Sequence, residues 1–286
     1  MNNILSVRGL TKEYDTFALR NVSFDVPAGY IMGFIGPNGA GKTTTIKSIL
    51  NMTDFSSGEI ELFGSGMAKG ERDNEDIGVV MDLPFYVGDW NMRDVEAAIS
   101  PFYSRWDTAK YWSLLGKFGI EKKKKVRELS RGMKVKLMLA AALSHDARLL
   151  ILDEPTSGLD PVARDELCTL LGDYMATEGR SVFFSTHITE DLEKIADYIT
   201  FIQNGEIVFS GLKDELLEKY FLVKGGPGEL GADQEKLLLG LRRHATGFEA
   251  MCEAANIGRL PESLLVEPVS LEEVIIFMNK EGNTHD

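Results

Sequence analysis

Alternation of hydrophobic and polar positions dominates the first third of the chain and predicts β-strands. Residues 4–35 alternate on either side of a turn at Pro27-Ala28-Gly29, which is typical of antiparallel strands that join a central sheet. Strand-like positions return over residues 58–81, after Ser56-Ser57-Gly58. The N-terminal part is therefore expected to be rich in strands.

Helical spacing replaces this alternation from about residue 92 to residue 143, and a second helix is predicted over about 162–177. Continuous apolar runs at 181–186 and 198–203 predict buried strands, because strands of a parallel sheet are covered on both faces. Strands followed by helices in this order predict an α/β protein.

A glycine-rich segment, Gly36-Pro-Asn-Gly-Ala-Gly-Lys-Thr43, follows the apolar run Ile31–Ile35 and precedes a predicted helix. Such a loop turns its backbone N–H groups toward phosphate oxygens, and the helix N-terminus adds a partial positive charge. Lys42 is placed to reach the terminal phosphates, and the Thr43 hydroxyl to bind Mg²⁺. The predicted ATP-binding residues of this segment are Gly36, Pro37, Asn38, Gly39, Ala40, Gly41, Lys42, Thr43 and Thr44.

Two carboxylates and a histidine end apolar strands at the edge where this loop is expected. The strand beginning at Leu149 ends in Asp153, a predicted Mg²⁺ ligand, and in Glu154, the candidate general base for the water that attacks the γ-phosphate. The strand over 181–186 leads into His187, which we assign as a catalytic sensor of the γ-phosphate, although a lone histidine is more often structural.

The order of these motifs resembles that of the ATP-binding cassette (ABC) transporter ATPases over about residues 1–220. Tyr14 matches the adenine-stacking aromatic of the family, although it also fits an ordinary strand aromatic. Leu129–Lys134 match the signature motif and Ser157–Asp160 the D-loop. The resemblance implies that two cassettes, identical or different, pack head to tail, so that Ser130 and Gly132 of one chain touch the ATP held by the other.

The resemblance also implies the architecture: a P-loop NTPase cassette with a RecA-like core, an antiparallel β subdomain and a helical subdomain over about 83–145. The cluster Gly225-Gly-Pro-Gly228 lies near the end of the cassette, which is placed at residue 220. Residues 221–286 are expected to form a small α/β accessory region. We expect residues 229–286 to be a tail of helix, strand and helix, too small for an independent core.

Two positions depart from the family pattern. Asp82 stands where a glutamine usually ends its strand, and a carboxylate there suits a metal ligand better than the usual amide role. Arg131 brings a charge into the signature motif, near the implied dimer interface. In these two departures and in residues 266–274, the chain resembles the ATPases of phenol-soluble-modulin and Ytr-type exporters.

Composition restricts the functional classes. The 286 residues are 44% hydrophobic, and no apolar run approaches the roughly 20 residues that cross a bilayer. The formal net charge of −13 argues against nucleic acid or an anionic lipid surface as a direct partner, and Lys122–Lys125 fit a solvated loop better than a lipid contact. The isolated Cys168 and Cys252 fit a reducing cytoplasm.

We therefore expect a Mg²⁺-dependent ATPase that lies at the inner face of the membrane through an integral membrane subunit and powers a transporter, most simply an exporter of peptides or toxic compounds. Two alternatives remain open. One is a regulatory module that binds ATP with little turnover, which Asp82 and Arg131 favour. The other is a non-transport ABC ATPase, which would show a long coiled-coil insertion or a second cassette in the chain, and the sequence shows neither.

Overall fold

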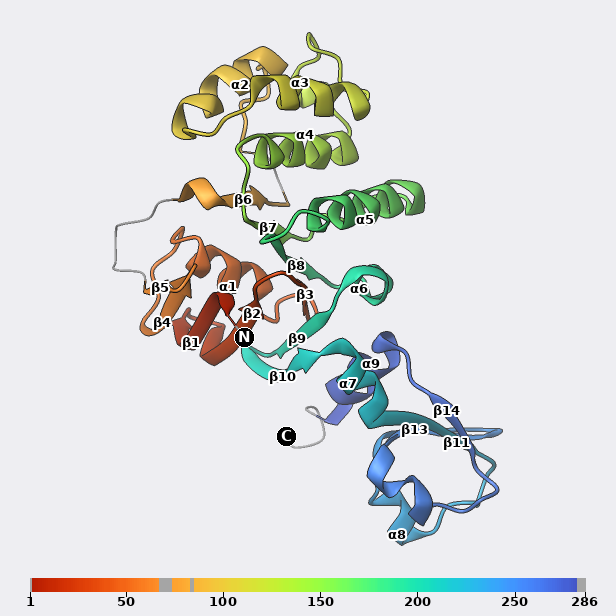
Figure 1. Cartoon of the computed structure of the whole chain (residues 1–286). Helices are drawn as coiled ribbons and strands as arrows, with labels where there is room; N and C mark the ends of the chain where they lie inside the picture. Colours follow the sequence, from red (N-terminus) through yellow and green to blue (C-terminus); the bar gives the residue numbers. More distant parts are fainter. Residues whose placement is uncertain (1, 67–73, 83–84, 282–286) are drawn as a thin grey trace. The chain divides into compact units, whose positions relative to one another are not determined.

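The structure, a computed structural model, describes residues 2–66, 74–82 and 85–281. It divides into two compact units, Met1–Ser210 and Gly211–Asp286 (Figure 1). The division falls within a strand, ahead of the boundary at residue 220 that the sequence predicts.

Unit 1 is built on a sheet of six strands in the order β10-β9-β3-β8-β7-β6. The pairs that β3 forms with β8 and β9, and β7 with β6 and β8, are parallel. The carboxyl ends of these parallel strands therefore meet along one edge of the sheet. The strands are β3 (Ile31–Ile35), β6 (Ile77–Val80), β7 (Leu149–Asp153), β8 (Ser181–Thr186), β9 (Tyr198–Gln203) and β10 (Glu206–Leu212).

A second sheet of unit 1 has the order β2-β1-β4-β5 and is antiparallel. Its strands are β1 (Asn3–Glu13), β2 (Ala18–Pro27), β4 (Ser57–Leu62) and β5 (Ser65–Gly66). The expectation that β1 and β2 join the central sheet was wrong. Their inward apolar residues instead pack across to the central sheet, where Phe24 stacks on Phe34 and Phe183.

Helices and short 3₁₀ turns complete unit 1, and α2, α3 and α4 lie together (Figure 1). Asn91 caps α2 and Asp107 caps α3, each with a side-chain oxygen that accepts backbone N–H groups. The helices are α1 (Lys42–Ile49), α2 (Met92–Ile99), α3 (Thr108–Lys117), α4 (Arg131–Ser144), α5 (Pro161–Met175) and α6 (Thr189–Ile195), and the 3₁₀ turns are η1 (Asn74–Asp76), η2 (Ser100–Phe102) and η3 (Val126–Glu128).

The predicted α/β fold class is confirmed. The strands expected at 181–186 and 198–203 are present with those bounds, and the helix expected over 162–177 is α5. All residues of β3, β7 and β8 are buried, as their continuous apolar runs predict. The predicted strand region 58–81 includes residues 67–73, and the predicted helical subdomain begins at residues 83 and 84; both segments lie outside the described residues.

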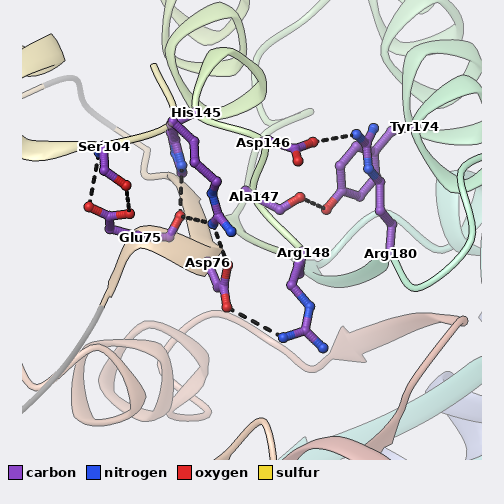
Figure 2. Close-up of polar contacts among 10 residues, drawn as sticks. Glu75, Asp76, Ser104, His145, Asp146, Ala147, Arg148, Tyr174 and Arg180 are labelled. Carbon is purple, nitrogen blue, oxygen red and sulfur yellow. Dashed lines mark hydrogen bonds and ion pairs between the residues drawn. The ribbon is translucent and has the colours of Figure 1, made fainter. Parts of the chain in front are cut away.

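A polar network ties the helical part of unit 1 to the amino ends of β6 and β7 (Figure 2). The carboxylate of Glu75 accepts hydrogen bonds from the backbone N–H and hydroxyl of Ser104, and the Nδ1 atom of His145 lies 3.0 Å from the Glu75 carbonyl oxygen. Asp76 pairs with Arg105 and Arg148. This network lies at the opposite ends of the strands from Asp153 and Glu154, so it braces the sheet away from the candidate site.

Unit 2 contains a four-stranded sheet in the order β12-β13-β11-β14, with antiparallel pairs throughout. Val223, Phe248, Ala250 and Cys252 belong to a hydrophobic cluster that is its own. The elements are α7 (Lys213–Lys219), β11 (Tyr220–Gly225), α8 (Ala232–Glu235), β12 (Leu238–His244), β13 (Gly247–Glu253), η4 (Ala254–Arg259), β14 (Leu265–Pro268) and α9 (Leu271–Glu281).

The expectation of a single strand between two helices in residues 229–286 was wrong. Neither β12 nor β13 alternates regularly between buried and exposed positions, so the usual pattern of a strand is missing. Arg242 of β12 faces Glu249 of β13 and forms an ion pair with it at 3.1 Å. We also expected this tail to be too small for a core of its own. The structure shows a hydrophobic cluster that these strands share with β11.

Candidate nucleotide-binding site

The glycine-rich loop connects β3 to α1 and has the backbone that its glycines predict. Gly39 and Gly41 adopt φ angles of 82° and 113°, in the left-handed region that glycine enters without strain. At Gly36 the reason is space, because an added Cβ would lie 2.3 Å from the carbonyl oxygen of Ile202. The loop therefore needs glycine at these positions to pass close to β9 and turn into α1.

Lys42 is folded back over its own loop. Its side chain is 5% exposed, and its Nζ atom donates to the carbonyl oxygens of Gly36 at 2.7 Å and Pro37 at 3.2 Å. The third contact of Nζ is an ion pair with Oε1 of Glu154 at 3.1 Å. Because an ammonium group has three N–H donors, these contacts use its full capacity, and a bound phosphate must replace at least one of them.

Glu154 follows β7 with a φ angle of 51°, an uncommon left-handed conformation for a residue with a side chain. Its backbone N–H lies 3.0 Å from the carbonyl oxygen and 3.1 Å from the hydroxyl of Ser185 on β8. Its Oε2 atom lies 2.7 Å from Nδ1 of His187, while Oε1 contacts Lys42. The structure thus brings the predicted base, sensor and phosphate-binding lysine into one chain of contacts.

Asp153 is almost fully buried at the end of β7. It accepts a hydrogen bond of 2.7 Å from the hydroxyl of Ser185. Burial raises the pKa of the Asp153 carboxyl, while hydrogen bonds from Ser185 and Thr43 act in the opposite direction.

The side chains near Asp153 show whether the site suits the predicted Mg²⁺ ion. Within the described residues, no group of three or more His, Cys, Asp or Glu side chains is arranged to hold a metal ion. One carboxylate beside one hydroxyl nevertheless fits Mg²⁺, because Mg²⁺ takes few protein ligands and completes its shell with phosphate oxygens and water. Asp153 and Thr43 are such a pair, and Thr43 is one of the groups that act to lower the pKa of the Asp153 carboxyl.

A pocket of about 470 Å³ opens over the glycine-rich loop. Thr16 and Phe17 line it as well, and sequence reasoning missed them. Tyr14 is not among the lining residues; it is exposed, and the ammonium of Lys12 lies 4.8 Å from its ring centre. The sequence feature that could have identified Phe17 is its position in the turn between β1 and β2. The full lining is Thr16, Phe17, Asn38, Gly39, Gly41, Lys42, Thr43, Thr44 and Glu154.

The other predicted residues do not line this pocket. Ser130 caps α4 by accepting the backbone N–H of Met133 at 3.3 Å, and Gly132 lies against Leu159. The Asp82 carboxylate forms an ion pair with Arg131. The metal role of Asp82 and the contact of Ser130 and Gly132 with a second chain's ATP stay predictions.

The part of the chain that the structure describes holds no helix with the length and apolar character of a membrane span.

Comparison with known proteins identifies the family of the chain. Residues 19–157 match the model of the ABC transporter family. The chain is 34% identical to the bacitracin transport ATP-binding protein BcrA of Bacillus licheniformis, over 74% of this chain and 72% of that protein. It is 33% identical to the lantibiotic transport ATP-binding protein SrtF of Streptococcus pyogenes, over 76% of this chain and 96% of that protein.

A solved structure described as the ATP-binding subunit of an ABC transporter superposes with a TM-score of 0.67 and 28% identity, covering 74% of this chain and 91% of that one. The glycine-rich loop, Lys42 and Glu154 share one pocket in a fold of this type. The chain therefore belongs to the ABC transporter family, as one of its ATP-binding subunits with ATPase activity.

Proposed function

We propose that this chain powers the export of peptides or similar toxic compounds, from the inner face of the cell membrane and through an integral membrane partner. Its similarity to the bacitracin and lantibiotic transport ATP-binding proteins supports this class of cargo. The finer likeness to phenol-soluble-modulin and Ytr-type exporters is part of the proposal and rests on Asp82, Arg131 and residues 266–274.

The observation that carries the proposal is the chain of contacts from Lys42 through Glu154 to His187, of which Lys42 and Glu154 line the pocket over the glycine-rich loop. In the proposed reaction, the loop N–H groups and Lys42 bind the phosphates of ATP, which releases Glu154 from Lys42. The Glu154 carboxylate then accepts a proton from the water that attacks the γ-phosphate. His187, which already contacts Glu154 in the structure, holds that carboxylate in place and is proposed to face the γ-phosphate.

Thr43 and Asp153 are the residues that would hold Mg²⁺ beside the phosphates, where the ion neutralises negative charge. The Ser185 hydroxyl fixes one oxygen of Asp153, so the other oxygen is oriented by the same contact. Adenine stacking is assigned to Tyr14 or Phe17, and the pocket lining favours Phe17.

Hydrolysis is proposed to require two cassettes, with Ser130 and Gly132 of one chain completing the site of the other. Specific activity should then rise with protein concentration while monomers dominate. Mixing Lys42→Ala chains with Ser130→Arg chains should restore activity, because one complete site forms between them. The matched control mixes Lys42→Ala chains with Glu154→Gln chains, which should stay inactive because each of the two sites lacks either the lysine or the base.

Flat specific activity across a dilution series in which sizing shows only monomer would contradict the shared site. The regulatory alternative draws on the departures at Asp82 and Arg131. It predicts ATP binding without measurable turnover at any chain concentration, so the same series separates the two proposals. Co-purification of an integral membrane protein tests the transport partner.

A further inference from the structure

Arg131 occupies an electrostatically unfavourable position, at the first residue of α4 directly after its N-cap Ser130. The N-terminus of a helix carries a partial positive charge, which favours acidic residues and opposes cations. The first turn of α4 nevertheless contains Arg131 and Lys134. A cation at this position needs compensation from another segment of the chain.

Asp82 supplies that compensation from the segment that follows β6. Its carboxylate forms an ion pair with the Arg131 guanidinium, across 49 positions of sequence. Val80 of β6 pairs with Leu152 of β7, and Asp82 and Glu154 each follow two residues after this last pair of the two strands. Both residues therefore lie beyond the carboxyl ends of adjacent strands, at the same edge of the sheet.

Arg131 also covers the turn that follows Glu154. A Cβ added to Gly158 would lie 3.2 Å from Cδ of Arg131 and 3.3 Å from its Nε. Gly158 has a φ angle of 69°, and the turn is tied to Glu154 by a backbone hydrogen bond of 3.2 Å from Ser157. One side chain therefore contacts the strand end at Asp82 and the turn after Glu154.

The ion pair contributes little to folding, because both side chains are about half exposed, 43% for Arg131 and 50% for Asp82. Its effect on the site is electrostatic. Asp82, Asp153 and Glu154 place three carboxylates at the edge where the terminal phosphate of ATP is proposed to bind, and Arg131 neutralises the first of them.

We propose that Arg131 is a positioning residue of the ATPase, which neutralises Asp82 and holds it away from the terminal phosphate of ATP bound to the same chain. The two departures from the family pattern thus act as a unit, and in this assignment Asp82 is the partner of Arg131 and does not act as the metal ligand that the sequence predicts. The inference rests on the proposed binding of phosphate at the glycine-rich loop. It predicts that Asp82 without its partner repels the terminal phosphate and leaves the binding of ADP largely unchanged.

The test is a double-mutant cycle with Arg131→Gln, Asp82→Asn and the double variant, using ATPγS and ADP as probes at chain concentrations where sizing shows monomer. We expect Arg131→Gln to raise the Kd of ATPγS about fivefold and that of ADP less than about twofold. In the Asp82→Asn background the same change should have little effect on either probe. High salt should reduce the difference.

A matched control is the exposed pair Arg8–Asp25 of the antiparallel sheet, with side chains 50% and 38% exposed. Arg8→Gln and Asp25→Asn should change neither Kd. Equal weakening of both probes, additive effects in the cycle, or an unchanged ATPγS Kd in Arg131→Gln would each overturn the inference. Failure of the wild-type chain to bind either nucleotide would overturn the proposed function and the inference with it.

Discussion

Glu154→Gln should tighten nucleotide binding to a single cassette. In the structure Glu154 competes with phosphate for Lys42, because its Oε1 atom lies 3.1 Å from Nζ and the two side chains are 14% and 5% exposed. Glutamine keeps a hydrogen-bond acceptor for the charged Lys42, but it removes the negative charge that attracts Lys42 and repels phosphate. At an effective dielectric constant of about 20 a charge pair at this distance is worth a few kcal/mol, so we expect nucleotide affinity to rise by roughly 1.4 kcal/mol, or about tenfold.

The assay is the Kd of ADP, measured by calorimetry at chain concentrations where sizing shows monomer. ADP avoids hydrolysis and the closure that a terminal phosphate is proposed to drive. Glu166→Gln is the matched control, because Glu166 also pairs with a lysine, Lys136, but does not line the loop pocket. An unchanged or weaker ADP affinity in Glu154→Gln, with the control unchanged, would refute the competition between Glu154 and phosphate.

Three further predictions address neighbouring residues. Because burial raises the pKa of Asp153, the ionised carboxylate costs free energy in the folded chain. This cost is present above the raised pKa and absent below the ordinary value of 3.8, where the carboxyl is protonated in both states. Asp153→Asn should therefore increase the free energy of unfolding in urea at pH 8 and leave it nearly unchanged at pH 3. His187→Ala should lower kcat about a hundredfold with little change in KM, since Glu154 loses its orienting partner; an unaltered kcat contradicts this. Gly36→Ala should reduce the free energy of unfolding by about 1–3 kcal/mol, because the added Cβ would clash with the carbonyl oxygen of Ile202. Wild-type stability in urea would contradict this and show that the loop shifts to accommodate the methyl group.

The parts of the fold and site that the sequence predicts well depend on short-range patterns. The strand at 181–186 is a continuous apolar run, and the loop before Lys42 requires glycine for backbone reasons that are local. Asp153, Glu154 and His187 follow from the rule that parallel strands end at one edge. Each of these features is encoded within a few residues of where it acts.

Contacts between distant segments could not be predicted in the same way. The pairing of Asp82 with Arg131 joins residues 49 positions apart, and their separate departures from the family pattern gave no sign that they meet. Phe17 lines the pocket because the turn after β1 brings it against Gly41, where an added Cβ would lie 2.9 Å from its ring. In unit 2, β12 and β13 lack a regular alternation of buried and exposed positions, and the pairing of Arg242 with Glu249 is visible only once their strands are paired.

The central claim is that the loop pocket hydrolyses ATP with Glu154 as the base, and single-turnover cleavage of ATP with Mg²⁺ tests it most directly. Wild type, Glu154→Gln and Lys42→Ala are compared at saturating protein, with nucleotide binding measured on the same samples. We predict that Glu154→Gln binds ATP and cleaves it at least about a hundredfold more slowly, whereas Lys42→Ala fails to bind it. Near-wild-type cleavage by Glu154→Gln would contradict the account.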